Sequence, residues 1–201
     1  MKTFILASAS PARRRLLLSA GIDPQVIVSG VDESLVTQTD AGLVAGTLAD
    51  LKAHAVAATV SGPLVLGCDS VLGFDGEVLG KPADAAEATQ RWQAMRGHTG
   101  VLYTGHCLID TATGSETAKT VETRVHFAEP SDEEIAAYVA SGEPLEVAGA
   151  FTIDGRGGAF VAGIEGDHGN VVGLSLPTLR NLLAILGVPI VSLWAKGRID
   201  A

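Results

Sequence analysis

The chain has 201 residues, of which 47% are hydrophobic and 18% are charged, and its formal net charge is -9. This composition can bury a substantial core, which excludes a disordered protein, and the length suits a single domain over residues 1–201. The negative charge argues against nucleic acid as a partner, because affinity for nucleic acid comes from neutralising its phosphates, whereas a few local cations can still hold a small anion.

The start of the chain predicts a cytoplasmic protein with no membrane partner. The segment MKTFILASASP holds one lysine and an apolar stretch that is too short for a signal sequence. No later run approaches the roughly 20 apolar residues of a membrane helix. Cys68 and Cys107 lack CxxC spacing and lie in apolar runs, which predicts buried, reduced thiols.

The first predicted helix carries positive charge in its first turn. Residues 3–7 read as a strand, Ser10 is a good N-cap, and Pro11 is a good first helical residue. Arginines in the first helical turn are mildly unfavourable because the helix N-terminus is already positive. Ser8, Ser10 and Arg13 therefore predict a loop that binds a phosphate. The alternative is an ordinary cap with solvated arginines, since the segment lacks Walker-loop glycines.

An acidic loop and a helix follow a second strand in PQVIVSGVDES. Glu33, beside Asp32, fits either a solvated turn or a site for a hard cation such as Mg²⁺ or Mn²⁺. The next helix is predicted over TLADLKAHAVAATV, with Thr47 as its N-cap. Lys52 lies at the edge of the apolar stripe of this helix. Its amine either has a functional role there or simply extends to solvent.

The segment PLVLGCDSVLGFDGEVLGKP predicts a β-hairpin with a tight turn at Asp75-Gly76. This register places Lys81 approximately opposite Ser70, beside Asp69. A carboxylate in so apolar a strand must be paired or functional, because burying an unpaired charge costs several kcal/mol. The predicted partners of Asp69 are a metal ion or Lys81, and a purely structural ion pair is the alternative.

The rest of the chain alternates helices with strands. We expect a helix in DAAEATQRWQAM, two long strands joined by the turn TATG, a helix in SDEEIAAYVASG, and a last helix in PTLRNLLAILG. The glycine-rich segment 149–176 reads as strands and turns. The predicted fold class is therefore α/β, with a mixed, twisted sheet that contains antiparallel strands and has flanking helices.

These residues together predict a class of chemistry. Cations and carboxylates at the sites above are the combination used in metal-assisted attack on a phosphate ester or anhydride. The five histidines show no HxH or HExxH spacing, which argues against a zinc site, and no GxSxG elbow is present.

Six segments give the chain a resemblance to a known family. LASASPARR, VDE at 31–33, LADLKA, GCDSVLGFDGEVLGKP, GAFTIDG and IEGDHGNVVGL follow one another over nearly the whole length. In this order and spacing they resemble the Maf family of nucleotide pyrophosphatases. The resemblance implies a cytoplasmic, homodimeric protein related in fold to inosine triphosphate pyrophosphatases, with two lobes around a cleft. It implies hydrolysis of a nucleoside triphosphate between its α and β phosphates, with a divalent cation, Mg²⁺ or Mn²⁺.

The resemblance also implies roles for individual residues. Asp69 matches the proton acceptor that activates water, and Glu33 matches a carboxylate of the metal site. The phosphate-cradling loop matches Ser8, Ser10 and Arg13. The lysines that hold the triphosphate and stabilise developing charge match Lys52 and Lys81.

Two departures from the family pattern concern specificity and the metal. Many members have Arg after the proline of the first motif, whereas this chain has Ala12, so the preferred base is open between pyrimidine and modified nucleotides. Many members have Gln where this chain has Asp154, which we interpret as an additional metal-site residue.

Two other functions are compatible with the same residues. One is a nucleotide-binding regulator of septum formation that does not hydrolyse its ligand. The other is a phosphomonoesterase or phosphodiesterase. The leading interpretation is a house-cleaning enzyme that removes unwanted nucleoside triphosphates.

Overall fold

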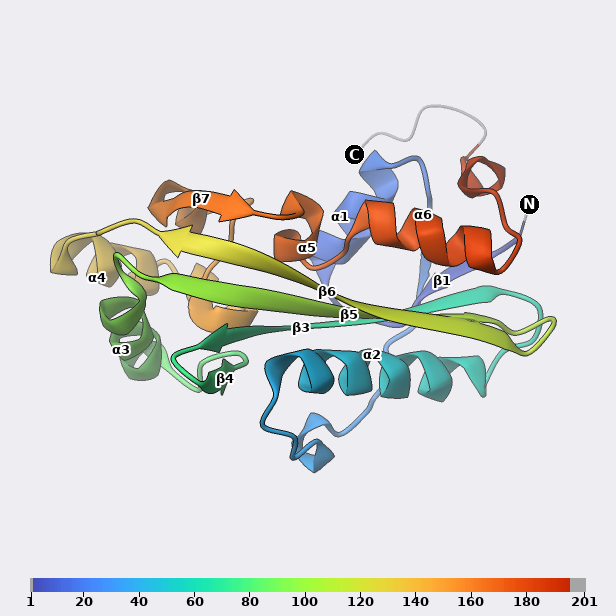
Figure 1. The fold of residues 1–201 in the computed structure, drawn as a ribbon, viewed down its shortest axis with the longest axis horizontal. Helices are drawn as coiled ribbons and strands as arrows, with labels where there is room; N and C mark the ends of the chain where they lie inside the picture. The colour runs from blue at the N-terminus through green and yellow to red at the C-terminus, as the bar shows by residue number, and fades with distance from the viewer. Residues whose placement is uncertain (1, 196–201) are drawn as a thin grey trace.

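The protein is described by a computed structural model over residues 2–195, built around one seven-stranded sheet (Figure 1). The strands are β1 (Phe4–Leu6), β2 (Gln25–Val26), β3 (Leu64–Phe74), β4 (Glu77–Leu79), β5 (Thr99–Asp110), β6 (Ser115–Phe127) and β7 (Val161–Glu165). Their order is β2-β1-β3-β5-β6-β7, and β4 also pairs with β3. β1 is parallel to β2 and β3, whereas the pairs from β3 to β7 are antiparallel. The predicted mixed α/β fold is confirmed.

Helices cover both faces of this sheet. They are α1 (Pro11–Ser19), α2 (Ala41–Ala57), α3 (Ala85–Met95), α4 (Asp132–Ala140), α5 (His168–Val172) and α6 (Leu176–Ile185). In Figure 1, α2 lies below the central strands, α1, α5 and α6 lie above them, and α3 and α4 occupy the left-hand end. Within the described residues, no helix combines the length and apolar character needed to span a membrane.

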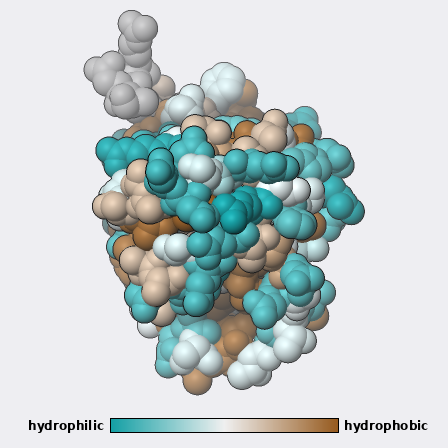
Figure 2. All heavy atoms as spheres, turned by 90° about the vertical axis from the view of Figure 1, so that its left-hand side faces the viewer, coloured by the Kyte–Doolittle hydropathy of each residue, from teal (hydrophilic) through white to brown (hydrophobic). Residues whose placement is uncertain are grey.

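The largest apolar clusters lie toward opposite ends of the long strands. One packs Leu66 of β3 and Leu108 of β5 against α1 and α6. The other packs Leu72 of β3 against α3 and α4, around the fully buried ring of Trp92. Figure 2 looks onto the end that holds α3 and α4, where hydrophilic side chains surround exposed hydrophobic atoms. The strands β3 and β5 therefore run through two lobes and connect them.

Two predictions of secondary structure were wrong, one for the start of a helix and one for a segment of strands and turns. α2 begins at Ala41, six residues before the predicted start, because the Asp40 side chain accepts a hydrogen bond from Leu43 N–H at 2.8 Å and caps it. Thr47 therefore lies inside the helix. Residues 168–172, predicted as strand or turn, form α5, which is capped by Asp167 through Gly169 N–H at 2.8 Å.

α2 lies unusually close to the sheet because two strand residues facing it are glycines. Gly67 of β3 and Gly105 of β5 have no side chain, and a Cβ on them would collide with Ala49 O and Ala45 O of the helix. Lys52 lies among the buried residues of this closely packed helix, rather than at the predicted edge of the stripe.

Candidate active site

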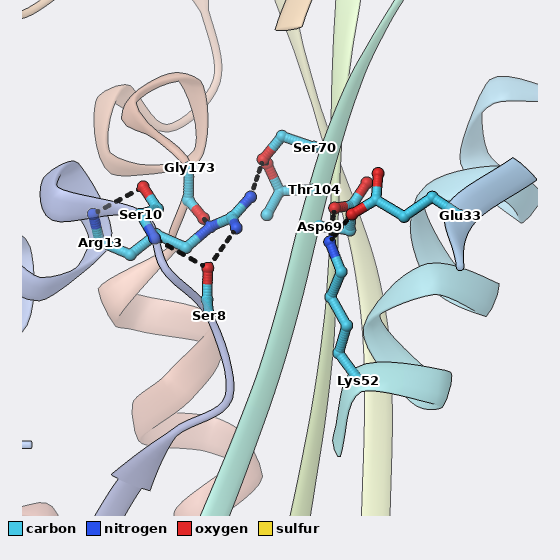
Figure 3. A network of polar contacts seen from close by, with 9 residues as sticks. All are labelled: Ser8, Ser10, Arg13, Glu33, Lys52, Asp69, Ser70, Thr104 and Gly173. Atoms are coloured by element: carbon cyan, nitrogen blue, oxygen red, sulfur yellow. Dashed lines mark hydrogen bonds and ion pairs between the residues drawn. The ribbon is translucent and has the colours of Figure 1, made fainter. Parts of the chain in front are cut away.

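The candidate site is built on Asp69 and Ser70, which are adjacent in β3. Successive side chains of a strand point to opposite faces of the sheet. Asp69 therefore points toward α2, whereas Ser70 points toward α1 and α5, and Figure 3 shows a polar group on each side of the strand.

On the α2 side, a lysine lies between two carboxylates. Lys52 Nζ donates to Asp69 Oδ1 at 2.5 Å and lies 2.7 Å from Glu33 Oε1. The side chains of Lys52 and Asp69 are each only 11% exposed, whereas that of Glu33 is 56% exposed. Burial raises the pKa of Asp69 above its ordinary value, against the opposing influence of the charges on Arg13 and Lys52. The lysine that pairs with Asp69 is thus Lys52 and not Lys81.

The local fold separates the roles of the two acids in the loop. Asp32 caps a short 3-10 helix, Glu33–Leu35, by accepting hydrogen bonds from Ser34 N–H at 3.0 Å and Ser34 Oγ at 2.6 Å. Glu33 is the first residue of that helix and faces Lys52. Only Glu33 is therefore directed at the site.

On the other side of β3, the guanidinium of Arg13 is buried within a set of hydrogen bonds. It donates from Nε to Gly173 O at 2.8 Å, from Nη1 to Ser8 Oγ at 2.9 Å and from Nη2 to Ser70 Oγ at 2.9 Å. Ser10 caps α1 by accepting from Arg13 N–H at 3.4 Å. Among residues 2–195, no carboxylate pairs with this guanidinium. A buried cation held only by neutral groups is suited to an anionic ligand.

Uncharged side chains extend this network beyond the residues that the sequence indicates. Ser70 Oγ lies 2.9 Å from Thr104 Oγ1, which donates to Asn170 O at 2.9 Å. The Asn170 amide donates to Thr123 Oγ1 at 3.1 Å, while its own Oδ1 is buried without a partner in the described chain. Single threonines and asparagines carry no distinctive sequence signal, although Asn170 of α5 belongs to the motif IEGDHGNVVGL.

A buried histidine supports the same side of the sheet. His106 Nε2 accepts from Ser175 N–H at 2.9 Å, at the N-terminus of α6. Burial lowers the pKa of His106 to about 4, so its ring is neutral at physiological pH. His106 therefore holds α6 in place rather than exchanging protons with a substrate.

The edge of β3 beside Asp69 and Ser70 has no neighbouring strand. Among residues 2–195, β1 pairs with residues 64–66 of β3 and β4 with residues 72–74, which leaves 67–71 uncovered on that edge. Leu64 N–H donates to Thr3 O, and Leu66 O accepts from Ala7 N–H, so alternate residues direct their backbone groups to this edge. The same alternation directs the backbone groups of Cys68 and Ser70 into the gap.

The structure does not bring Lys81 to Asp69. The predicted turn is present, with positive φ at Asp75 and Gly76, and the register runs from Phe74↔Glu77 to Leu72↔Leu79. The strand then ends, and the carbonyl of residue 80 accepts hydrogen bonds from Arg91 of α3 and from the N–H of Gly149, in the 3-10 helix Ala148–Ala150. The Lys81 side chain is 63% exposed and lies 3.8 Å from Glu146.

Asp154 also lies apart from the carboxylate pair. Its Oδ2 is 3.4 Å from Arg15 Nη2 of α1, and its side chain is 31% exposed. It therefore lies near the helix that carries Arg13, rather than beside Glu33. Its assignment to a metal site stays a prediction.

Comparisons with known proteins identify the family. The family model described as Maf-like protein matches residues 3–186. A protein of Streptomyces coelicolor, named nucleoside triphosphate pyrophosphatase, is 61% identical over 96% of this chain and 95% of its own length. Proteins of the same name from Salinispora tropica and Nostoc punctiforme are 59% and 53% identical. The Salinispora match covers 96% of this chain and 88% of that protein. The Nostoc match covers 95% of this chain and 97% of that protein. The buried Arg13 and Asp69 thus lie within a chain that belongs to the Maf family.

Proposed function

We propose that this protein is a metal-dependent nucleoside triphosphate pyrophosphatase, which cleaves the α–β phosphoanhydride to give a nucleoside monophosphate and pyrophosphate. The names of the relatives support hydrolysis of nucleoside triphosphates. The observation that carries the proposal is the pair of adjacent residues Asp69 and Ser70. Asp69 pairs with the buried Lys52, and Ser70 accepts a hydrogen bond from the buried Arg13, which has no counter-charge among the described residues. Both lie at the part of the β3 edge that has no neighbouring strand.

Arg13 and its neighbours are proposed to bind the triphosphate. Ser8 and Ser10 precede the first turn of α1, whose N-terminus attracts negative charge. The guanidinium is already oriented by Ser8, Ser70 and Gly173, so a phosphate meets it without further ordering. The uncovered backbone groups of β3 offer further hydrogen bonds at the same place.

Asp69 is proposed to be the general base. Its raised pKa increases its basicity, and a base is most effective when its pKa approaches the operating pH. It takes a proton from water as the water oxygen bonds to phosphorus, and the phosphoanhydride bond breaks to release pyrophosphate. Lys52 holds the carboxylate in place and offers positive charge to the developing anion.

Glu33 and Asp69 fit a hard divalent cation, Mg²⁺ or Mn²⁺. Two carboxylates meet at one cation here, the ammonium of Lys52, and Mg²⁺ is commonly held by one or two carboxylates together with substrate phosphates. When bound, the cation would polarise the phosphate oxygens and lower the barrier to attack. Roles for Lys81 in charge stabilisation and for Asp154 at the metal rest on the family resemblance alone.

The finer aspects of function are proposed on the same family basis. They are a pyrimidine or modified base, a house-cleaning role, a homodimer and a cytoplasmic location. No observation in the structure favours a septation regulator over an enzyme, and the assay below distinguishes the two.

The test is an endpoint assay of wild type and Asp69→Asn with Mg²⁺ or Mn²⁺ against ordinary and modified nucleoside triphosphates, with pyrophosphate and orthophosphate resolved. We expect pyrophosphate from the wild type, and from Asp69→Asn a loss of turnover of about 10²-fold or more with nucleotide binding retained. Asp75→Asn is the matched control, because this exposed turn residue has positive φ, which Asn tolerates.

Three outcomes contradict parts of the proposal. Release of orthophosphate alone would identify a phosphatase, and nucleotide binding without any turnover would identify the regulator. Full activity in Asp69→Asn would remove this carboxylate from the mechanism.

A further inference from the structure

A second group of metal-ligating side chains lies on the far side of α2 from Asp69. Asp50 and His54 are one helical turn apart on α2, and Cys107 comes from β5. One ligand atom from each lies within 4.8 Å of the others, and this is the only such trio in the described residues. The pair Asp50 and His54 are about half exposed, whereas Cys107 is buried beneath them.

Two of the three separations in this trio match those of a tetrahedral zinc site, and the third is within 4.8 Å. His54 Nδ1 and Cys107 Sγ are each 3.5 Å from Asp50 Oδ1. Two ligands on a tetrahedral Zn²⁺ lie about 3.4 to 3.6 Å apart, given bonds of roughly 2.1 Å to N or O and 2.3 Å to S. Asp50 is therefore spaced to share one ion with either His54 or Cys107, and the 4.8 Å limit on the third separation lets small side-chain movements bring all three atoms to it.

A fourth residue supplies the outer partner that metal-bound histidines need. His54 Nε2 lies 2.9 Å from Glu116 Oε2 of β6. A histidine that binds a metal through one nitrogen usually donates its other N–H to a carboxylate, which fixes the ring. Glu116 would fix His54 with Nδ1 toward the trio. In the structure, His54 Nδ1 lies 3.0 Å from the Asp50 backbone carbonyl. Metal binding would replace this hydrogen bond, and the carbonyl would still accept the N–H of the helix backbone four residues on.

We propose that Asp50, His54 and Cys107 form a binding site for a thiophilic divalent cation of the zinc class, with Glu116 as the acceptor for His54 Nε2–H. A thiolate ligand favours Zn²⁺ over Mg²⁺ or Mn²⁺, so this site and the carboxylate pair differ in metal preference. Binding displaces the thiol proton of Cys107, which already points at Asp50 Oδ1, and releases it to solvent. The bound ion links α2 to β5 and β6. The histidine spacing argued against zinc because such motifs detect only histidines that lie close together in one segment, whereas these ligands come from α2 and β5 and include one histidine.

The test uses chelator-treated full-length protein with excess Mg²⁺ present to occupy hard-cation sites, and adds Zn²⁺ or Co²⁺. We expect one equivalent of zinc to remain after gel filtration, a thiolate-to-cobalt charge-transfer absorption, and a rise in Tm with zinc, since the site exists only in the folded state. These readouts do not involve nucleotide hydrolysis, so the proposal stands or fails independently of the proposed function.

Three variants test the residues of the site, and a fourth is the control. His54→Ala, an exposed substitution that leaves the core intact, should weaken zinc binding about tenfold or more, and Glu116→Gln should weaken it about 10- to 100-fold. Cys107→Ser should abolish the charge-transfer absorption. His126→Ala is the matched control, because His126 lies 3.2 Å from Glu165 in a similar exposed pair that has no cysteine.

Two results would overturn the proposal. One is the absence of stoichiometric zinc binding in the presence of Mg²⁺. The other is zinc binding that is unaffected by His54→Ala and Cys107→Ser but lost in Glu33→Gln, which would place the ion at the carboxylate pair.

Discussion

Arg13 brings a positive charge into a buried position where only hydroxyls and a carbonyl accept its hydrogen bonds. Desolvating a charge is costly, and neutral acceptors offset only part of that cost. Binding a phosphate provides the missing counter-charge. Arg13 therefore lowers the free energy of unfolding of the unliganded protein and raises its affinity for an anion.

We expect Arg13→Met to lower kcat/KM for the nucleotide by about 10² to 10³-fold, because it removes charge stabilisation from the phosphates. Arg13→Lys should recover part of this loss, since it keeps the charge but lacks the planar fork. The free energy of unfolding in urea should not fall, because removing the buried charge offsets or outweighs the lost hydrogen bonds.

The control for this comparison is Arg14→Met, whose native side chain is 49% exposed and lies 4.0 Å from Asp23. It should leave kcat/KM unchanged. If Arg13→Met kept wild-type kcat/KM, Arg13 would have only a structural role.

For single residues, the sequence indicates those whose charge is unfavourable in the predicted local structure. Asp69 is a charge within an apolar strand, and Arg13 is a cation at a positive helix end. The same logic could not choose between Lys52 and Lys81, because the choice depends on where β4 ends. It also could not find Thr104, whose hydroxyl is one of many in the chain.

Among the elements, α2 decides the geometry of the site. Its buried face carries Lys52, and its distance from the sheet is set by Gly67 and Gly105. Local signals revealed that a helix exists here, but its start at Ala41, capped by Asp40, was missed because Gly42 and Gly46 follow. The role of Gly67 and Gly105 was not predictable, since it depends on which helix packs over which strand.

We expect Gly105→Ala to separate α2 from β5, because the new Cβ would meet Ala45 O. The strain should lower the free energy of unfolding by about 1 to 3 kcal/mol. Lys52 should move relative to Asp69, so kcat should fall even at a temperature where the variant remains folded. Urea unfolding and steady-state kinetics on the same preparation check both parts.

Gly163→Ala provides the comparison, because this strand glycine has only His126 Cδ2 nearby, at 3.9 Å. It should affect neither quantity. Unchanged kcat in Gly105→Ala would mean that the close packing of α2 does not position Lys52.

For the whole molecule, the sequence predicts the class of fold better than the order and pairing of the strands. The hairpins β3–β4 and β5–β6 have local turn signals, so a mixed sheet with antiparallel strands could be predicted. The parallel pairing of β1 with β3 joins residues about 60 positions apart and leaves no local pattern. The open edge of β3 results from that distant pairing, so this part of the site could not be predicted.

The two lobes should unfold together, because β3 and β5 run through both apolar clusters. Trp92 reports on one lobe, and in Trp194→Phe it is the only tryptophan. Cys68 reports on the other lobe, and in a Cys107→Ala background it is the only cysteine. We expect Trp92 fluorescence, Cys68 thiol reactivity and far-UV circular dichroism, all measured in the combined variant, to give one urea midpoint. Exposure of Cys68 at a clearly lower urea concentration than Trp92 would show that the lobes are separate folding units and that residues 1–201 do not form a single domain.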